Sequence, residues 1–301
     1  MSSIEDRFYR YLLASRKDQD WGLYVTDAGR TRIFPNTPYP PPGHPPDYNF
    51  TVDQGRILRA YQVVYITHGG GYFETKQTGL KKIEPGNAFL LFPNQWHRYW
   101  PLPETGWNEH WVGFDGETAK RITERGFFTP QKPIFNAGYD EYLVGLFDKI
   151  IDLIKNEPFG FQQTIASLTM EILSKMNSLN YGESPDSSMM LQVIREAKSM
   201  LAERIAEPVC MQELAESLGV SYSWFRWAFK TYTGFPPHQY LLEMRMERAK
   251  FLLSYTKESI KEISNELGFD SPYYFSRLFK KKNGKNPSDW RKHAKIELQQ
   301  G

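Results

Sequence analysis

The sequence predicts a multidomain protein, with a β domain in the first part of the chain and an all-α half after it. Three observations support this division. Apolar and polar residues alternate between Trp21 and Asp115, apolar residues recur with helical spacing after Tyr139, and the excess of positive charge lies in the second half. We therefore expect an antiparallel β-barrel, a helical hairpin and a C-terminal group of helices.

The overall composition is that of an ordinary folded protein. Of the 301 residues, 40% are hydrophobic and 24% are charged, which is enough apolar content for two or three cores. No apolar run reaches the ~20 residues of a membrane-spanning helix, and MSSIEDRFYR carries charges where a secretion signal is apolar. The single cysteine, Cys210, excludes a disulfide framework within the chain. We expect a cytoplasmic protein with no membrane partner, in which Cys210 is a small buried residue.

The β region consists of short aromatic and β-branched runs separated by Gly and Pro. These runs are WGLYVTDAG, YQVVYITHGGGYFET, NAFLLFPN, HRYW and HWVGF. Their alternation and their turn residues are typical of antiparallel strands in a small barrel or sandwich. The Pro-rich segment 35–46, PNTPYPPPGHPP, fits neither a helix nor a central strand. We expect it to form an ordered loop that covers the barrel mouth.

Two amphipathic helices follow, separated by a break between Asn156 and Gly160. Their apolar stripes are wide, so we expect a helical hairpin over 136–180 that joins two chains in a homodimer, with Ile150 and Leu168 at the interface. Packing of the same stripes against the chain's own barrel is the alternative. The polar segment 181–188 is the expected linker, which leaves 1–135 as the barrel and 189–301 as the C-terminal domain.

The C-terminal domain is basic and contains an internal repeat. Residues 189–301 hold 18 Lys and Arg against 13 Asp and Glu, whereas residues 1–188 hold 19 against 22. LGVSYSWFRWAFKTYTGFPPHQY at 218–240 matches LGFDSPYYFSRLFKKKNGKNPSDW at 267–290, with five identities spaced 50 residues apart. A positive half of this kind favours a polyanionic partner, and the repeat indicates two copies of one helical unit.

Each copy of the repeat predicts a helix, a tight turn and a second helix. Gly219 and Gly268 suit the turns because glycine adopts left-handed backbone angles. Ser221 and Ser271 are expected to cap the helices that follow, and Pro272 fits the first helical position. This arrangement is the helix-turn-helix plan, whose second helix lies in the major groove of DNA. The alternative is a duplicated helical hairpin with a purely structural role.

Residues 189–293 resemble the AraC (arabinose-operon regulator) family of bacterial transcription factors, with FSRLFKKKNGKNPSDWR at 275–291 matching the family's signature stretch. The resemblance implies that a long helix, about 237–254, joins two recognition helices that enter successive segments of the major groove. Helical spacing places Phe225, Phe229, Phe275 and Phe279 in the core. The expected DNA-binding residues are Ser223, Arg226, Trp227, Lys230, Tyr273, Tyr274, Arg277 and Lys280.

Arginine is the side chain that reads guanine by two parallel hydrogen bonds, so Arg226 and Arg277 are the expected specificity residues. Phosphate contact or simple exposure is the alternative for both. Trp227 and Tyr274 are expected to meet thymine methyl groups or to pack on sugars. The remaining basic side chains are expected to hold phosphates, or to be solvated, rather than to read bases: Lys230, Lys280, Lys281, Lys282 and Lys285.

The β region resembles, more loosely, the cupin-type sensing domain of the same family, through ITHGGGYFE, IEPGNAFLLFPNQWHRY and WNEHWVGF. This resemblance implies a ligand site formed by Thr31, Arg56, Tyr99, Glu109 and Trp111. Gln54 holds the position at which the family's arginine is expected, and Arg56 lies two residues further on. A tryptophan face with polar groups around it suits a sugar, although each tryptophan also fits a role in the core.

We therefore expect a transcription regulator, an activator controlled by a sugar effector, with operator DNA and RNA polymerase as partners. No catalytic residue, metal or cofactor is assigned, because His68, His97 and His110 stand singly and lack the H-x-H spacing of metal-dependent cupins. Two alternatives stay open. One is a cupin-type metal-dependent enzyme tethered to DNA, and the other is a ligand-independent dimeric DNA-binding protein.

Overall fold

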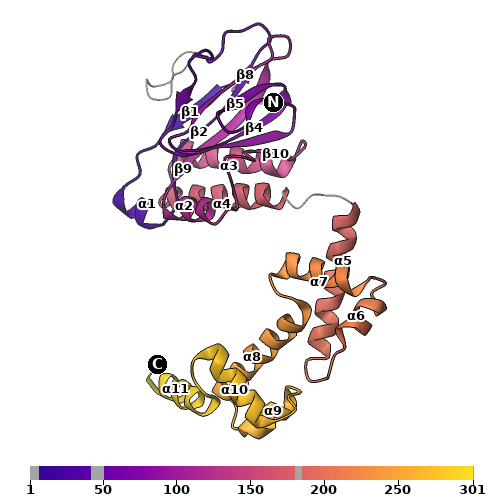
Figure 1. Ribbon diagram of the computed structural model, residues 1–301. Helices are drawn as coiled ribbons and strands as arrows, with labels where there is room; N and C mark the ends of the chain where they lie inside the picture. Colours follow the sequence, from indigo (N-terminus) through magenta and orange to yellow (C-terminus); the bar gives the residue numbers. More distant parts are fainter. Residues whose placement is uncertain (1–6, 42–50, 180–184, 301) are drawn as a thin grey trace. The chain divides into compact units, whose positions relative to one another are not determined.

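The computed structural model describes residues 7–41, 51–179 and 185–300. The chain divides into two compact units, Met1–Gly182 and Glu183–Gly301, and Figure 1 shows the strands in the first unit and the helical second unit. The fold class expected from the sequence, an antiparallel β domain followed by a helical domain, is confirmed. Among the described helices, none is both long and apolar enough to cross a membrane.

The first unit is built from antiparallel strands in two sheets. The strands are β1 (Arg7–Tyr11), β2 (Tyr24–Ile33), β3 (Arg56–Ile57), β4 (Tyr61–Gly69), β5 (Gly71–Thr75), β6 (Gly79–Ile83), β7 (Asn87–Leu91), β8 (Trp96–Pro101), β9 (Trp107–Asp115) and β10 (Ile134–Asn136). Six of them form one sheet in the order β1-β2-β9-β4-β7-β10, and the other four form a second sheet in the order β3-β8-β5-β6. Strands β1 and β10 lie outside the range that the sequence pattern predicted.

The six-stranded sheet has an apolar core on each face, because alternate residues of a strand point to opposite sides. One face shares a core with the four-stranded sheet, and this core includes Val64, Trp107 and Trp111 from the first sheet and Phe73 and Tyr99 from the second. The other face packs against helices. The β domain is therefore a three-layer arrangement of sheet, sheet and helices.

The helices of the first unit are α1 (Arg16–Asp20), α2 (Glu117–Glu124), α3 (Glu141–Asn156) and α4 (Phe161–Leu179). The predicted hairpin corresponds to α3 and α4, which lie against the six-stranded sheet in Figure 1. Its apolar stripes do not point outward. Ile150 and Leu168 are buried in the same core as Val63 and Val112 of the sheet. The expectation that these two residues form a dimer interface is wrong, because the chain's own sheet covers them.

The second unit is all helical. Its helices are α5 (Pro185–Glu203), α6 (Met211–Ser217), α7 (Tyr222–Thr233), α8 (Pro237–Tyr255), α9 (Ile260–Glu266), α10 (Pro272–Asn283) and α11 (Pro287–Gln300). Two separate cores form within it. The first contains Phe225 and Phe229 of α7, and the second contains Phe275 and Phe279 of α10. Each copy of the repeat therefore closes around its own pair of phenylalanines.

The turn chemistry expected for both copies is present. Ser221 and Ser271 each accept a hydrogen bond from a backbone N–H in the first turn of the following helix. Gly219 and Gly268 have φ values of 71° and 67°, in the left-handed region. Pro272 is the first residue of α10. The sequence thus specifies both helix-turn-helix units locally.

Two local expectations do not hold. Helix α5 begins at Pro185, so residues 185–188 of the expected linker are helical, while residues 181–184 lie outside the described residues. Cys210 was expected to be buried, but its side chain is exposed. It stands at the N-cap of α6, one residue before the buried stripe of that helix begins at Met211.

Candidate ligand pocket and DNA-binding surface

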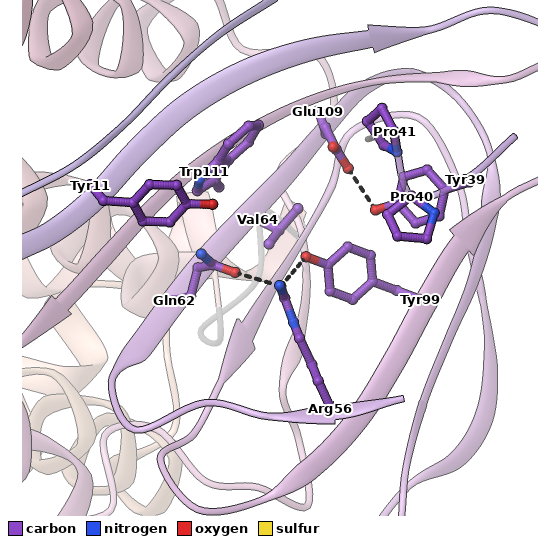
Figure 2. A pocket seen from close by; sticks show the side chains of 10 residues that line it. All are labelled: Tyr11, Tyr39, Pro40, Pro41, Arg56, Gln62, Val64, Tyr99, Glu109 and Trp111. Carbon is purple, nitrogen blue, oxygen red and sulfur yellow. Dashed lines mark hydrogen bonds between the residues drawn. The ribbon is translucent and has the colours of Figure 1, made fainter. Parts of the chain in front are cut away.

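A pocket opens in the β domain between the two sheets. Its walls come from β1, β3, β4, β8, β9 and from the loop after β2, as Figure 2 shows. The residues that line it are Tyr11, Tyr39, Pro40, Pro41, Arg56, Gln62, Val64, Tyr99, Glu109 and Trp111. Its lining combines four aromatic side chains with one cation and one carboxyl group, which is the composition of a site for a small polar ligand.

Arg56 is the cation of the pocket and is held by neighbouring side chains. Its Nη2 atom donates to the Tyr99 hydroxyl at 2.6 Å and to the Gln62 carbonyl at 3.2 Å, and its Nε atom donates to His97 Nε2 at 3.3 Å. Gln62 in turn donates to the buried Asp27 at 2.8 Å. This chain of hydrogen bonds fixes the guanidinium at one side of the pocket, where it can bind ligand oxygens without large rearrangement.

Glu109 lies on β9 and is bonded to the loop that follows β2. The Tyr39 hydroxyl donates to Glu109 Oε2 at 3.2 Å, and the Tyr39 ring stands edge-on to Trp107 with 5.7 Å between centroids. Burial raises the pKa of Glu109 to about 7, although the Tyr39 hydroxyl and the Arg56 charge act in the opposite direction. Near neutral pH this carboxyl group can therefore both donate and accept hydrogen bonds.

The pocket is nearly filled by the chain itself. With Tyr39, Pro40 and Pro41 in place, the free cavity has a volume of about 30 Å³. Ligand pockets typically measure ~300 to 1,000 Å³. A ligand of sugar size therefore requires the segment around Tyr39 to move outward.

The structure brings together four of the five residues predicted for the ligand site, namely Arg56, Tyr99, Glu109 and Trp111. Arg56 reaches the pocket, whereas Gln54 contributes a backbone carbonyl that accepts from Trp96 Nε1. Thr31 does not line this pocket. It pairs with Glu109 across β2 and β9, and it lines a neighbouring cavity with Arg30, Arg32 and His68.

Three further lining residues, Tyr11, Gln62 and Val64, were not predicted, whereas Tyr39, Pro40 and Pro41 belong to the segment that was expected to cover the barrel mouth. One signal was available for Gln62, which is a polar residue inside the apolar run YQVVYIT. The Pro-rich segment was predicted to cover the barrel mouth, but nothing in its sequence singled out Tyr39. Residues 42–46 of that segment lie outside the described residues.

The tryptophans and histidines of the β domain have separate environments. Trp107 and Trp111 are buried in the core between the sheets, whereas Trp21 is 60% exposed. His97 lies beside Arg56, and burial lowers its pKa to about 3. His110 packs on Phe147 of α3, and burial lowers its pKa to about 4. Within the described ranges, no three or more His, Cys, Asp or Glu side chains gather where they could hold a metal ion.

The second unit presents two exposed recognition surfaces. On α7 and α10 the buried phenylalanines face the core, and the eight predicted DNA-binding residues are all exposed: Ser223, Arg226, Trp227, Lys230, Tyr273, Tyr274, Arg277 and Lys280. Trp227 is 60% exposed and Tyr273 is 78% exposed, so both rings can contact a partner. Both helices therefore offer aromatic and cationic side chains to the outside.

The two recognition helices are not identical in their outer positions. Counted from the first residue of each helix, Arg226 is the fifth residue of α7, whereas Arg277 is the sixth residue of α10. The residue equivalent to Arg277 in α7 is Trp227. Because successive helical residues differ by about 100° in direction, the two arginines point to different sides of their recognition helices.

One of the lysines expected to hold phosphates or to be solvated has a partner within the chain. Lys282 forms an ion pair with Glu243 of α8 and is only partly exposed. This pair attaches α10 to α8, so Lys282 acts within the fold. Lys281 is exposed and stays available for a phosphate.

Comparisons with known proteins identify relatives of both units. Residues 43–173 match the family described as AraC-like ligand binding domain, and residues 214–293 match the family described as helix-turn-helix domain. The chain is 27% identical over 241 residues to the Msm operon regulatory protein of Streptococcus mutans, covering 77% of this chain and 84% of that protein. It is 26% identical over 256 residues to the arabinose operon regulatory protein of Escherichia coli, covering 81% and 84%.

Among solved structures, an AraC-type transcriptional regulator from Chromobacterium violaceum is 33% identical, with 35% of this chain and 93% of that chain covered and a TM-score of 0.33.

Proposed function

Because this chain belongs to the AraC family of transcription regulators, we propose that a sugar bound in the pocket beside Arg56 and Trp111 controls its binding to DNA. The chain is a DNA-binding regulator with a ligand-binding domain. The single observation that supports control by a ligand is that four of the five side chains implied by the resemblance, though far apart in the sequence, line one pocket. The nature of the effector is the part that goes beyond family membership.

The pocket has the chemistry that a carbohydrate requires. A flat indole, Trp111, can cover the apolar C–H face of a sugar ring, while Arg56, Tyr99, Gln62 and Glu109 can bond its hydroxyl groups. The similarity to a regulator of an arabinose operon supports the same class of ligand. We infer that the effector is a sugar and that the protein acts as an activator.

A thermal-shift screen of mono- and oligosaccharides against the full chain tests the sugar proposal. A true effector at ~100 times its dissociation constant adds ~2.7 kcal/mol to the free energy of unfolding. The shift should disappear in Trp111→Ala and persist in Trp21→Ala, because Trp21 is an exposed tryptophan outside the pocket. A shift that survives Trp111→Ala would place the ligand elsewhere, and a screen without any shift would contradict the sugar proposal.

We propose that the segment 35–41 acts as a lid over this pocket. Tyr39 bonds Glu109, its ring contacts Trp107, and Pro40 and Pro41 complete the cover. Tyr39→Ala should enlarge the cavity by the volume of a phenol ring. Binding of p-cresol to Tyr39→Ala, but not to wild type or Tyr39→Phe, would support the lid. Equal binding of p-cresol by all three proteins would contradict it.

We propose that the regulator is not an enzyme. The curated relatives are transcription regulators, and His68, His97 and His110 lie on three different strands. Metal analysis of the purified protein, together with turnover assays on any sugar that binds, tests the alternative of a metal-dependent cupin enzyme. Stoichiometric metal and product formation would favour that alternative.

RNA polymerase is the partner that an activator requires, and reporter transcription with and without the effector tests this part of the proposal. We also propose that two copies of the chain form a homodimer. Its interface cannot use Ile150 and Leu168, which the chain's own sheet covers. Sedimentation of the full chain at micromolar concentration tests the oligomeric state, and a monomer under those conditions would contradict the dimer.

A further inference from the structure

The helix that joins the two helix-turn-helix units contributes to both of their cores. Leu241, in the first half of α8, packs in the core of the first helix-turn-helix unit, whereas Met246 and Ala249 pack in the core of the second helix-turn-helix unit. Arg245 lies where α8 passes from one core to the other. A charged, partly buried side chain therefore stands at the junction of two apolar cores.

The guanidinium of Arg245 binds backbone carbonyls from both helix-turn-helix units. Its Nε atom donates to Ile205 O at 2.8 Å and its Nη2 atom donates to Glu207 O at 2.7 Å, both in the segment between α5 and α6. Its Nη1 atom donates to Gly268 O at 3.2 Å, in the turn of the second helix-turn-helix unit. The planar guanidinium spreads its five N–H groups over three nitrogens and can bridge three acceptors in this way, whereas lysine has all its donors on one nitrogen.

The same two segments touch each other directly. A Cβ atom added to Gly268 would lie 2.1 Å from Ala206 O, so the backbone of the second turn packs against the segment after α5. The Phe269 ring lies 5.6 Å from the Arg245 guanidinium and is buried. The corresponding glycine of the first helix-turn-helix unit, Gly219, has no such neighbour within 4 Å. The contact is therefore specific to the joint between the units.

We propose that Arg245 is a positioning residue for DNA binding, which holds the two helix-turn-helix units at the separation and angle that two successive major-groove segments require. Both recognition helices must fit one DNA duplex at the same time. A single inserted base pair moves the second segment by about 3.4 Å and turns it by about 35°. A protein with a fixed joint loses contacts on such DNA, whereas a protein with a loosened joint adapts.

This proposal goes beyond the family assignment and rests on DNA binding by both units. The alternative is that Arg245 only stabilises the fold by bonding the carbonyls beyond α5. That role would lower the melting temperature of a variant without changing which DNA spacing it prefers. The preferred spacing between the two DNA elements is therefore the measurement that separates the two roles.

The experiment begins with selection of DNA from a random library by the full wild-type chain. The selected duplex and versions with one base pair inserted or removed between its two elements are then titrated with wild type and Arg245→Met. We expect wild type to bind the altered duplexes about 5- to 150-fold more weakly, the range for one lost bidentate base contact. Arg245→Met should bind the selected duplex more weakly and should discriminate among the spacings by less than about threefold.

Arg248→Met is the matched control, because it removes the same charge from the same helix. Arg248 pairs with Glu266 at 3.7 Å on the exposed side of α8. It should keep the wild-type preference for spacing. Circular dichroism and thermal unfolding establish that each variant is folded. If Arg245→Met does not fold, Arg245→Lys is tested instead, since lysine keeps the charge but replaces the three-nitrogen fork with a single nitrogen.

Three outcomes overturn the proposal. The first is an Arg245→Met, or Arg245→Lys, protein that discriminates among spacings as sharply as wild type. The second is a loss of spacing preference in Arg248→Met equal to that in Arg245→Met. The third is a wild-type protein that binds all three spacings equally, which leaves DNA binding itself intact but removes any fixed joint for Arg245 to hold.

Discussion

Glu109 is the residue whose chemistry is most altered by its place in the fold. Its pKa rises from 4.5 to about 7 on folding because it is buried between the two sheets. The folded state therefore holds a proton that the unfolded chain releases between these two values. The contribution of Glu109 to stability is complete below pH 4.5 and is lost as the pH rises through 7.

Glu109→Gln should remove this pH dependence. The free energy of unfolding of the variant, minus that of wild type, should rise by up to about 3 kcal/mol between pH 4.5 and pH 7. Burial lowers the pKa of His97 to about 3 and that of His110 to about 4, so these residues also make stability depend on pH below their usual pKa of 6.5, but they contribute equally to both proteins and the difference isolates Glu109. Urea unfolding at a series of pH values measures it, and a difference that stays flat would contradict the shifted pKa.

The recognition helices give a second prediction about single residues. Arg226→Ala and Arg277→Ala should each weaken binding to the selected operator by ~1 to 3 kcal/mol and relax the base preference at one position. Lys281→Ala should weaken binding to all sequences alike, because we expect its exposed ammonium group to hold a phosphate, which carries no sequence information. Selection from a random library compares the three consensus sequences. An Arg277→Ala consensus identical to that of wild type would remove its role in base reading.

The residues that the sequence revealed share one property, which is that local pattern decides their position. Ser221, Gly268 and Phe275 follow from helix capping, turn geometry and helical period. Tyr11 was not predicted and Tyr39 was predicted only as part of the Pro-rich segment, because both enter the pocket through contacts between segments that are far apart in the chain. Thr31 lines the neighbouring cavity together with Glu109. The resemblance indicated its strand but not which cavity its side chain enters.

The two turn glycines give a prediction about elements. Both have positive φ, so alanine at either position costs about 1 to 2 kcal/mol of backbone strain. Gly268→Ala should cost a further ~1 to 3 kcal/mol, because its Cβ would overlap Ala206 O, whereas Gly219 has open space around it. Hydrogen exchange of residues 189–293 in urea measures both effects. Equal destabilisation by the two substitutions would contradict the close contact at Gly268.

The hairpin of α3 and α4 shows what amphipathic pattern alone cannot decide. The spacing of apolar residues correctly gave two helices and their buried stripes. It could not say which surface covers the stripes, since a partner chain and the chain's own sheet bury apolar area equally well. The outcome depends on the outer face of the six-stranded sheet, whose valines provide the missing apolar surface.

At the scale of the whole molecule, two compact units divide sensing from DNA binding. The pocket belongs to the first unit and the recognition helices belong to the second. A ligand therefore regulates DNA binding only if it binds with different affinity to the states of the protein that do and do not bind DNA. Such coupling is reciprocal: ligand that tightens operator binding tenfold binds tenfold tighter to the DNA complex, about 1.4 kcal/mol in each direction.

The most direct test of ligand-controlled DNA binding is one pair of titrations. The sugar with the largest thermal shift is titrated into the full chain with and without the selected operator, and its two dissociation constants are compared. We expect different constants in wild type, and the same change in operator affinity when sugar is added first. Equal sugar affinities with and without operator would mean that the pocket does not control DNA binding.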